Sequence, residues 1–169
     1  MPVIRQYFQS APASRDYHHA YAGGLLVHTM ECVTTAGLLA KHIHLSQSES
    51  ELCEVGALCH DLGKISMIAT STPHGDHRRK TLELLDVPLR TLILEDPKLG
   101  RGLETILNQI AYTKGFPNFL ATQLVIQADR FSTASARDRR LDDVQLPGST
   151  PPSVSAVMSV IESNTSPSN

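Results

Sequence analysis

Apolar residues recur every three or four positions along several stretches of the chain, which is the spacing of one face of an α-helix. The clearest stretch runs from Gly24 to about Ile43, where Leu26, Met30 and Val33 keep this period. Few strand-forming residues interrupt it. The pattern predicts a long buried helix.

A second helix is predicted from about Glu49 to His60. Ser46 and further serines stand ahead of acidic residues at its start, and this combination caps a helix N-terminus and complements the helix dipole. Gly63 is followed by a stretch rich in Ser, Thr, Pro and Gly. These residues predict that the helix ends there and leads into a loop.

The positions of proline and of apolar residues predict the remaining elements. We expect a helix from His77 to Leu85 that ends before Pro88, an apolar segment before Pro97, and helices over residues 101–113 and 119–136. Residues 1–22 are expected to be irregular or briefly helical. The predicted fold is therefore all-α, a helical bundle.

The end of the chain differs in composition from the rest. After Leu146 it is rich in proline and serine and has almost no charge, which is too little apolar mass to fold alone. A length of 169 residues suits one domain with a full core. We expect one folded domain over residues 1–145 and a flexible tail or linker over 146–169.

Composition supports a helical fold and limits the partners and cellular compartments that we expect. Aromatic residues make up only 5%, which disfavours an aromatic-rich barrel or sandwich. A net charge of −2 gives no broad cationic field, so any nucleic acid would be bound locally. The three cysteines, Cys32, Cys53 and Cys59, lack CxxC spacing, which predicts a reducing, cytoplasmic setting. They fall on apolar positions, so we expect them to pack in the core. No long apolar run or signal-type N-terminus is present, so we expect no contact with a membrane.

Four polar residues interrupt apolar helical segments: His28, His60, Asp61 and Asp129. A lone histidine such as His28 is more often a hydrogen-bonded core residue than a ligand. Burying an unpaired carboxylate costs several kcal/mol, so each must be paired, hydrogen-bonded or metal-bound. Two imidazoles and two carboxylates from three helices form a mixed nitrogen and oxygen site. Such a site suits Mn, Fe, Ni, Zn or Mg.

The order His28, His60-Asp61, Asp129 resembles the H…HD…D signature of the HD-domain metal-dependent phosphohydrolases, and "HDLGK" is a common form of its central motif. The resemblance covers about Pro12 to Asp138. It implies an all-helical bundle in which these four residues hold a divalent metal ion. It further implies an enzyme in which metal-activated water attacks a phosphoester of a nucleic acid or nucleotide, with Asp61 in the catalytic centre.

A narrower likeness lies in "PASRDYHHAYAGGLLVHT" and "QADRFSTASARD", which are similar to the HD domain of MOBH-class conjugative relaxases. It favours relaxase-like DNA processing. HD-domain 3′-to-5′ exoribonucleases share a similar opening and are the rival. The region "ETILNQIAYTKG" lacks the histidines that HD proteins with two or three metals add before the final aspartate.

Further residues are candidates for the site around this centre. Lys64, one turn beyond His60, is placed to neutralise phosphate charge or protonate a leaving oxygen, although helix-terminal lysines are commonly plain dipole partners. Arg130 is a candidate for substrate binding. Gly23 and Gly24 open a helix, where backbone amides can approach an anion, although a tight turn needs glycine too.

Four other histidines are weaker candidates for a second metal or a phosphate: His18, His19, His74 and His77. The alternative for each is a solvent-exposed histidine near a turn or loop. An HD-fold metal-binding module with a regulatory or recruitment role also stays open as the function. The oligomeric state does not follow from the sequence.

Overall fold

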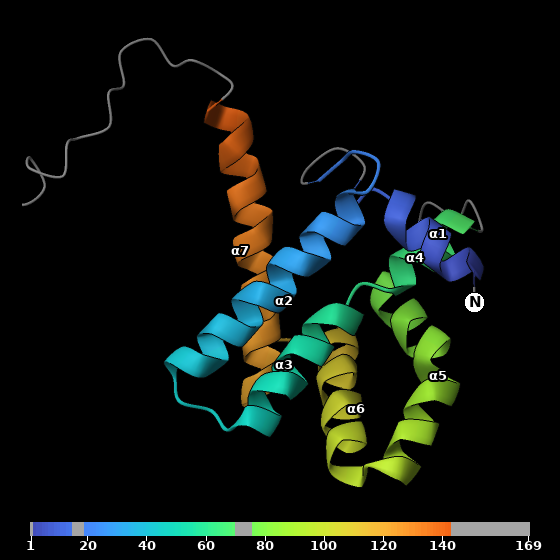
Figure 1. Cartoon of the computed structure of the whole chain (residues 1–169), viewed down its shortest axis with the longest axis vertical. Coiled ribbons are helices and arrows are strands. Elements are labelled where there is room, and N and C mark those ends of the chain that lie inside the picture. The colour runs from blue at the N-terminus through green and yellow to red at the C-terminus, as the bar shows by residue number, and fades with distance from the viewer. Residues whose placement is uncertain (1, 15–18, 70–75, 143–169) are drawn as a thin grey trace, which may run out of the picture. The chain divides into compact units, whose positions relative to one another are not determined.

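The computed structural model describes residues 2–14, 19–69 and 76–142, which form helices and no strands (Figure 1). The all-α prediction is therefore confirmed. The helices are α1 (Pro2–Ser10), α2 (Gly24–His42), α3 (Gln47–Cys59), α4 (Gly63–Ala69), α5 (His77–Glu95), α6 (Pro97–Tyr112) and α7 (Leu120–Asp142).

The chain divides into two compact units, Met1–Asp138 and Arg139–Asn169. Of the second unit the structure describes only the last residues of α7. The predicted tail over residues 146–169 lies outside the described residues, so the tail and its boundary stay predictions.

The two helices that carry the strongest sequence signals form as expected. α2 starts at Gly24 and ends at His42, one residue before the predicted end. α3 begins at Gln47, two residues before the predicted start, because Ser46 accepts from the Glu49 amide while the Glu49 side chain accepts from the Ser46 amide. This capping box satisfies donors that the first helical turn leaves without partners.

Two sequence predictions about the middle of the chain are wrong. The residues from Gly63 to Ala69 form α4 instead of a loop, whereas residues 70–75 of the predicted loop lie outside the described residues. α5 continues through Pro88 to Glu95. Pro88 is exposed, and the next residue, Leu89, is buried in the apolar cluster, so α5 packs against the core beyond the proline. Gly63 is required for close packing, because a Cβ there would lie 1.9 Å from the carbonyl oxygen of His77. α4 and α5 therefore pack tightly at this point.

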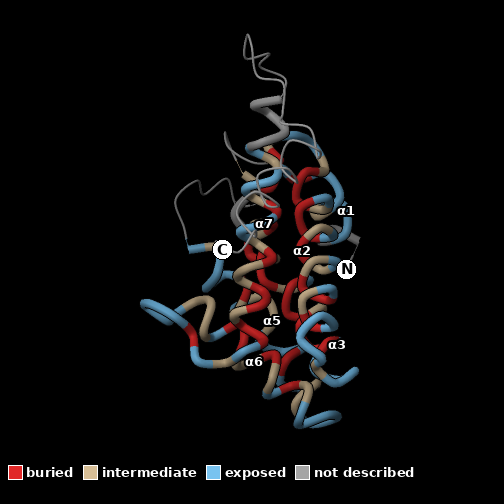
Figure 2. Tube along the Cα trace, turned by 90° about the vertical axis from the view of Figure 1, so that its left-hand side faces the viewer, coloured by how far each residue is buried: buried red, intermediate tan, exposed pale blue. Residues whose placement is uncertain are grey.

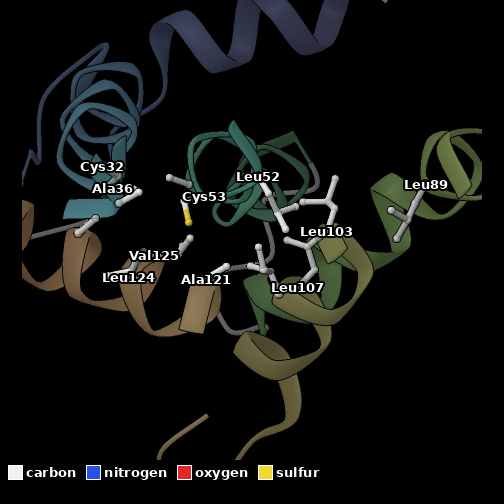
Figure 3. Packing of buried hydrophobic residues seen from close by; sticks show 14 residues of the cluster. Cys32, Ala36, Leu52, Cys53, Leu89, Leu103, Leu107, Ala121, Leu124 and Val125 are labelled. Atoms are coloured by element: carbon white, nitrogen blue, oxygen red, sulfur yellow. The ribbon is translucent and has the colours of Figure 1, made fainter. Parts of the chain in front are cut away.

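α2 packs against α3, α3 against α6, and α5 against α6. One cluster of buried apolar side chains fills the space between these helices and α7 (Figure 3). Buried residues also follow the facing sides of α2 and α7 (Figure 2). At the centre Gly56 leaves room for Ile106 and Val125, since its Cβ would lie 3.0 Å and 3.2 Å from their methyl groups.

A smaller apolar cluster joins the N-terminal segment to α2 and α4. Ala11, Ala13, Leu25 and Ile65 are all buried there. The Leu25 amide donates to the Ala11 carbonyl oxygen, which fixes the segment before α2 against the start of that helix. None of the helices in the described ranges is both long and apolar enough to cross a lipid bilayer.

Candidate metal centre

Side chains from three helical segments meet at one point in the bundle. His28 comes from α2, His60 and Asp61 from the end of α3, and Asp129 from α7. Nε2 of His28 lies 3.3 Å from Asp61 Oδ2 and 3.4 Å from Asp129 Oδ1. Nε2 of His60 lies 3.4 Å from Asp61 Oδ2. The structure thus brings together all four residues that the sequence singles out.

The ring of His60 is oriented by its own helix. Its Nδ1 lies 2.6 Å from the Ala57 carbonyl oxygen, which can only accept, so Nδ1 carries the donated proton. In the neutral ring Nε2 is then a lone-pair atom. It is buried and has no hydrogen-bond partner among the described residues. The Asp61 carboxylate beside this atom is stabilised by a positive charge, which either a proton on Nε2 or a bound metal ion would supply.

The electrostatics of His28 also favour a positive charge at this site. Burial alone would lower its pKa, but hydrogen bonds to Asp129 and Asp61 outweigh burial and raise the pKa to about 11. Burial raises the pKa of Asp61, yet His60, His28 and Lys64 bring it well below its usual range. The pKa of Asp129 is also lowered, chiefly by His28 against the effect of burial. Without a metal ion, the site therefore holds a proton on His28.

A divalent cation fits this donor set, because imidazole nitrogen and carboxylate oxygen are ligands for such ions. Single donor atoms of His28, Cys32, His60 and Asp129 lie within 4.8 Å of one another and could hold a metal. Cys32 is a residue that the sequence reasoning placed only in the core. It lies one helical turn after His28, with Sγ 3.7 Å from Nε2 of that ring.

Asp61 is a better candidate ligand than Cys32. Burial raises the pKa of the Cys32 thiol, more than nearby His28 lowers it, whereas a metal binds the thiolate. Asp61 is already ionised, and its Oδ2 is close to both imidazoles. Cys53 and Cys59 pack in the apolar cluster, as the sequence predicts.

A cavity of about 320 Å³ opens beside the candidate metal centre. His60, Asp61 and Asp129 form part of its lining, and cationic or ionisable side chains surround them. Those side chains are Lys64, His77, Arg78 and Arg130. A negatively charged ligand in the cavity would therefore contact the candidate metal ligands on one side. It would also contact the cationic rim, which consists of Lys64, Arg78 and Arg130.

Lys64 and His77 both contact Asp61. The Lys64 ammonium lies 2.6 Å from Oδ2, and Nε2 of His77 lies 3.3 Å from Oδ1. Burial lowers the pKa of His77, and the carboxylate of Asp61 opposes that shift only in part. A neutral His77 imidazole beside Asp61 is compatible with its predicted role at a second metal. His18 and His74 lie outside the described residues.

The geometry of the Gly-Gly pair does not favour phosphate binding by Gly23 and Gly24. Their amides donate to the carbonyl oxygens of Ser10 and Tyr21, and neither glycine lines the cavity. Gly24 instead allows a close approach, because a Cβ there would lie 1.9 Å from the His19 carbonyl oxygen. His19 is accordingly buried against α2, outside the cavity lining.

Sequence reasoning also missed Ser132 and Glu31. Nδ1 of His28 lies 2.9 Å from Ser132 Oγ, and Ser132 donates to the Glu31 carboxylate. Helical spacing is the sequence feature that could have identified them, since Glu31 follows His28 by three residues and Ser132 follows Asp129 by three. Such a spacing places side chains on one face, but it does not show which of them touch.

Comparison with protein-family models matches residues 25–134 to the HD domain. The matched range is more than half of the chain and contains all four converging residues. Comparisons with the curated proteins and with the solved structures gave no match. The narrower likeness to relaxases or to exoribonucleases therefore has no support from a relative.

Proposed function

The chain belongs to the HD domain family, and we propose that it is a metal-dependent phosphohydrolase acting on a phosphoester of a nucleic acid or nucleotide. HD domains are typically metal-dependent phosphohydrolases, although some are not catalytic. One observation carries the proposal. His28, His60, Asp61 and Asp129 converge at one point, and the last three of them line a cavity that also has Lys64, Arg78 and Arg130 in its lining.

The four converging residues would hold the metal ion. A divalent ion bound there lowers the pKa of a water molecule and supplies a hydroxide nucleophile for phosphorus. Asp61 joins this centre to the cavity, since its carboxylate contacts His28, Lys64 and His77. We infer that Asp61 is a ligand whose orientation Lys64 maintains.

The cationic rim would bind the phosphate. Lys64 has three ammonium protons, and its contact with Asp61 leaves others for a phosphate oxygen. Arg130 and Arg78 line the same cavity and are exposed, so they can reach the charge of a larger substrate. In the proposed reaction a water molecule that has released one proton to solvent bonds through its oxygen to phosphorus, and the bond to the leaving oxygen breaks. Lys64 gives that oxygen a proton and regains one from solvent.

The finer proposal is relaxase-like processing of DNA, and its support is the sequence likeness around His28 and Asp129. None of the described residues that line the cavity is a Phe, Tyr or Trp, so the cavity offers none of the large aromatic side chains on which bases usually stack. Phosphate contacts from the rim would then dominate binding. Affinity for DNA should fall as salt rises.

The experiment is elemental analysis of protein purified without a metal-binding tag, followed by turnover assays with Mn²⁺. The substrates are p-nitrophenyl phosphate, bis-p-nitrophenyl phosphate, single-stranded DNA and single-stranded RNA. We expect metal-dependent hydrolysis by the wild type and none by Asp61→Asn. The control is Asp86→Asn, which removes an exposed carboxylate paired with Arg90 on α5 and should not change turnover.

The substrates separate the alternatives. Cleavage of DNA supports the relaxase-like role, and preference for RNA supports the exoribonuclease-like rival. Bound metal with no turnover on any substrate would contradict the hydrolase and support a regulatory binding module.

A further inference from the structure

A chain of hydrogen bonds lies behind His28, on the side that faces away from the two aspartates. Ser132 on α7 is 3% exposed, and its Oγ lies 2.9 Å from Nδ1 of His28. The same hydroxyl donates to Oε2 of Glu31 at 2.7 Å. Neither Ser132 nor Glu31 lines the cavity. Ser132 contacts the site through His28.

The donors and acceptors in this chain fix the tautomer of His28. A serine hydroxyl has one proton, and the Ser132 proton goes to a carboxylate that can only accept. The contact between Nδ1 and Ser132 Oγ must then use a proton on Nδ1. In the neutral ring Nε2 is left as the lone-pair atom. That atom is the one that lies beside Asp61 and Asp129.

The far end of the chain is held by the segment before α2. Nε2 of His19 lies 3.1 Å from Oε2 of Glu31 and 3.4 Å from Ser132 Oγ. Nδ1 of His19 lies 3.0 Å from the Tyr21 hydroxyl. His19 takes a φ of 47°, in the left-handed region that side chains other than glycine rarely adopt. This unfavourable backbone puts the His19 ring against Glu31.

We propose that Ser132 and Glu31 are positioning residues that hold His28 in the Nδ1–H form and direct its Nε2 to the metal. The proposal rests on the metal site of the proposed function. A free imidazole can exchange its tautomers and rotate, and both motions would remove the lone pair from the ion. Partners of this kind typically change metal affinity by about 10–100-fold when they are removed.

The test measures the affinity of metal-free protein for Mn²⁺ by competition with a chelator. Ser132→Ala should bind Mn²⁺ about 10–100-fold more weakly than the wild type. Ser132→Thr keeps the hydroxyl and should restore most of the affinity, which a purely packing role would not do. Ser135→Ala is the matched control, because Ser135 is exposed on the same helix. Its affinity should equal that of the wild type.

Glu31→Gln provides a second variant that keeps the shape of the side chain. Glu31 is 27% exposed, so the variant should fold even if Ser132→Thr does not. The amide can donate to Ser132, which lets the serine proton turn toward His28 and disturb the tautomer. If both residues act through His28, the double variant should bind Mn²⁺ no more weakly than Ser132→Ala alone.

The outcomes separate this inference from the function. Equal Mn²⁺ affinity in the wild type, Ser132→Ala and Glu31→Gln would overturn the inference and leave the metal site intact. Additive losses in the double variant would also overturn it, since they would mean two independent effects. A wild-type protein that binds no Mn²⁺ would overturn the proposed function and the inference with it.

Discussion

Val125 and Asp129 lie one turn apart on α7, but different interactions stabilise the regions around them. Val125 is fully buried against Gly56 and Ile106 in the apolar cluster. Asp129 is partly exposed and faces His28. Val125 also lines the cavity, but its neighbours in the cluster are apolar side chains that need no ligand. Around Asp129 two carboxylates and two imidazoles need a positive charge among them.

The difference shows where stability and function reside in this bundle. Burial of Ile106 and Val125 stabilises the fold whatever the site contains, because removal of apolar surface from water requires no partner. The polar region is stable only when a proton or a cation balances Asp61 and Asp129. Changes at the two regions should therefore respond differently to added metal.

The largest effect should come from Asp61→Asn in the metal-free protein. It removes the buried charge that pairs with Lys64 and with protonated His28. Breaking such a buried pair typically costs about 3–5 kcal/mol. Urea unfolding in the presence of a chelator measures the loss. An unchanged free energy of unfolding would show that this region is not held by charge.

Ile106→Ala should cost about 2–5 kcal/mol of the free energy of unfolding by leaving a cavity in the apolar cluster. Its affinity for Mn²⁺ should equal that of the wild type, because Ile106 packs in the apolar cluster and has no donor atom for a metal ion. Urea unfolding and chelator competition measure the two quantities. A large loss of metal affinity would mean that the two regions are coupled through the packing.

Saturating metal should stabilise the wild type by about 2.7 kcal/mol at a concentration 100 times the dissociation constant. Metal should raise the free energy of unfolding of Ile106→Ala by the same amount, although this variant is less stable without metal. Asp129→Asn should gain much less, because it lacks one ligand. Thermal unfolding with and without Mn²⁺ provides the comparison. Equal gains in all three proteins would contradict the assignment of Asp129.

Metal binding should release about one proton per ion near pH 8, since the His28 pKa is raised from 6.5 to about 11. In the metal-free protein this proton stabilises the folded state fully below about pH 6.5, and that contribution is lost as the pH rises through 11. Between these values the ion must displace the proton. Affinity should thus rise by about 1.4 kcal/mol per pH unit. Calorimetry in buffers of different ionisation enthalpy counts the protons.

Much of this organisation could be predicted from sequence, but for different reasons in the two regions. The period of apolar residues identified α2 and α7, and the Ser46 capping box marked the start of α3. The sequence predicts a helix end before Pro88, but α5 continues through the proline to Glu95. A proline can kink a helix instead of ending it, and tertiary packing, which a local pattern does not contain, helps to decide the outcome.

The four converging residues could be singled out because each interrupts an apolar helix. Cys32 was assigned to the core alone because a thiol also suits a core position. The chain of Ser132, Glu31 and His19 was missed because it joins positions more than 100 residues apart. Gly24 was interpreted as an anion site, although its real constraint is the carbonyl oxygen of His19.

The most direct measurement is anomalous scattering from crystals of the protein loaded with Mn²⁺. We predict one strong peak within bonding distance of Nε2 of His28 and His60 and of carboxylate oxygens of Asp61 and Asp129. A loaded crystal with no peak among these four side chains, or with its peak elsewhere in the molecule, would contradict the account.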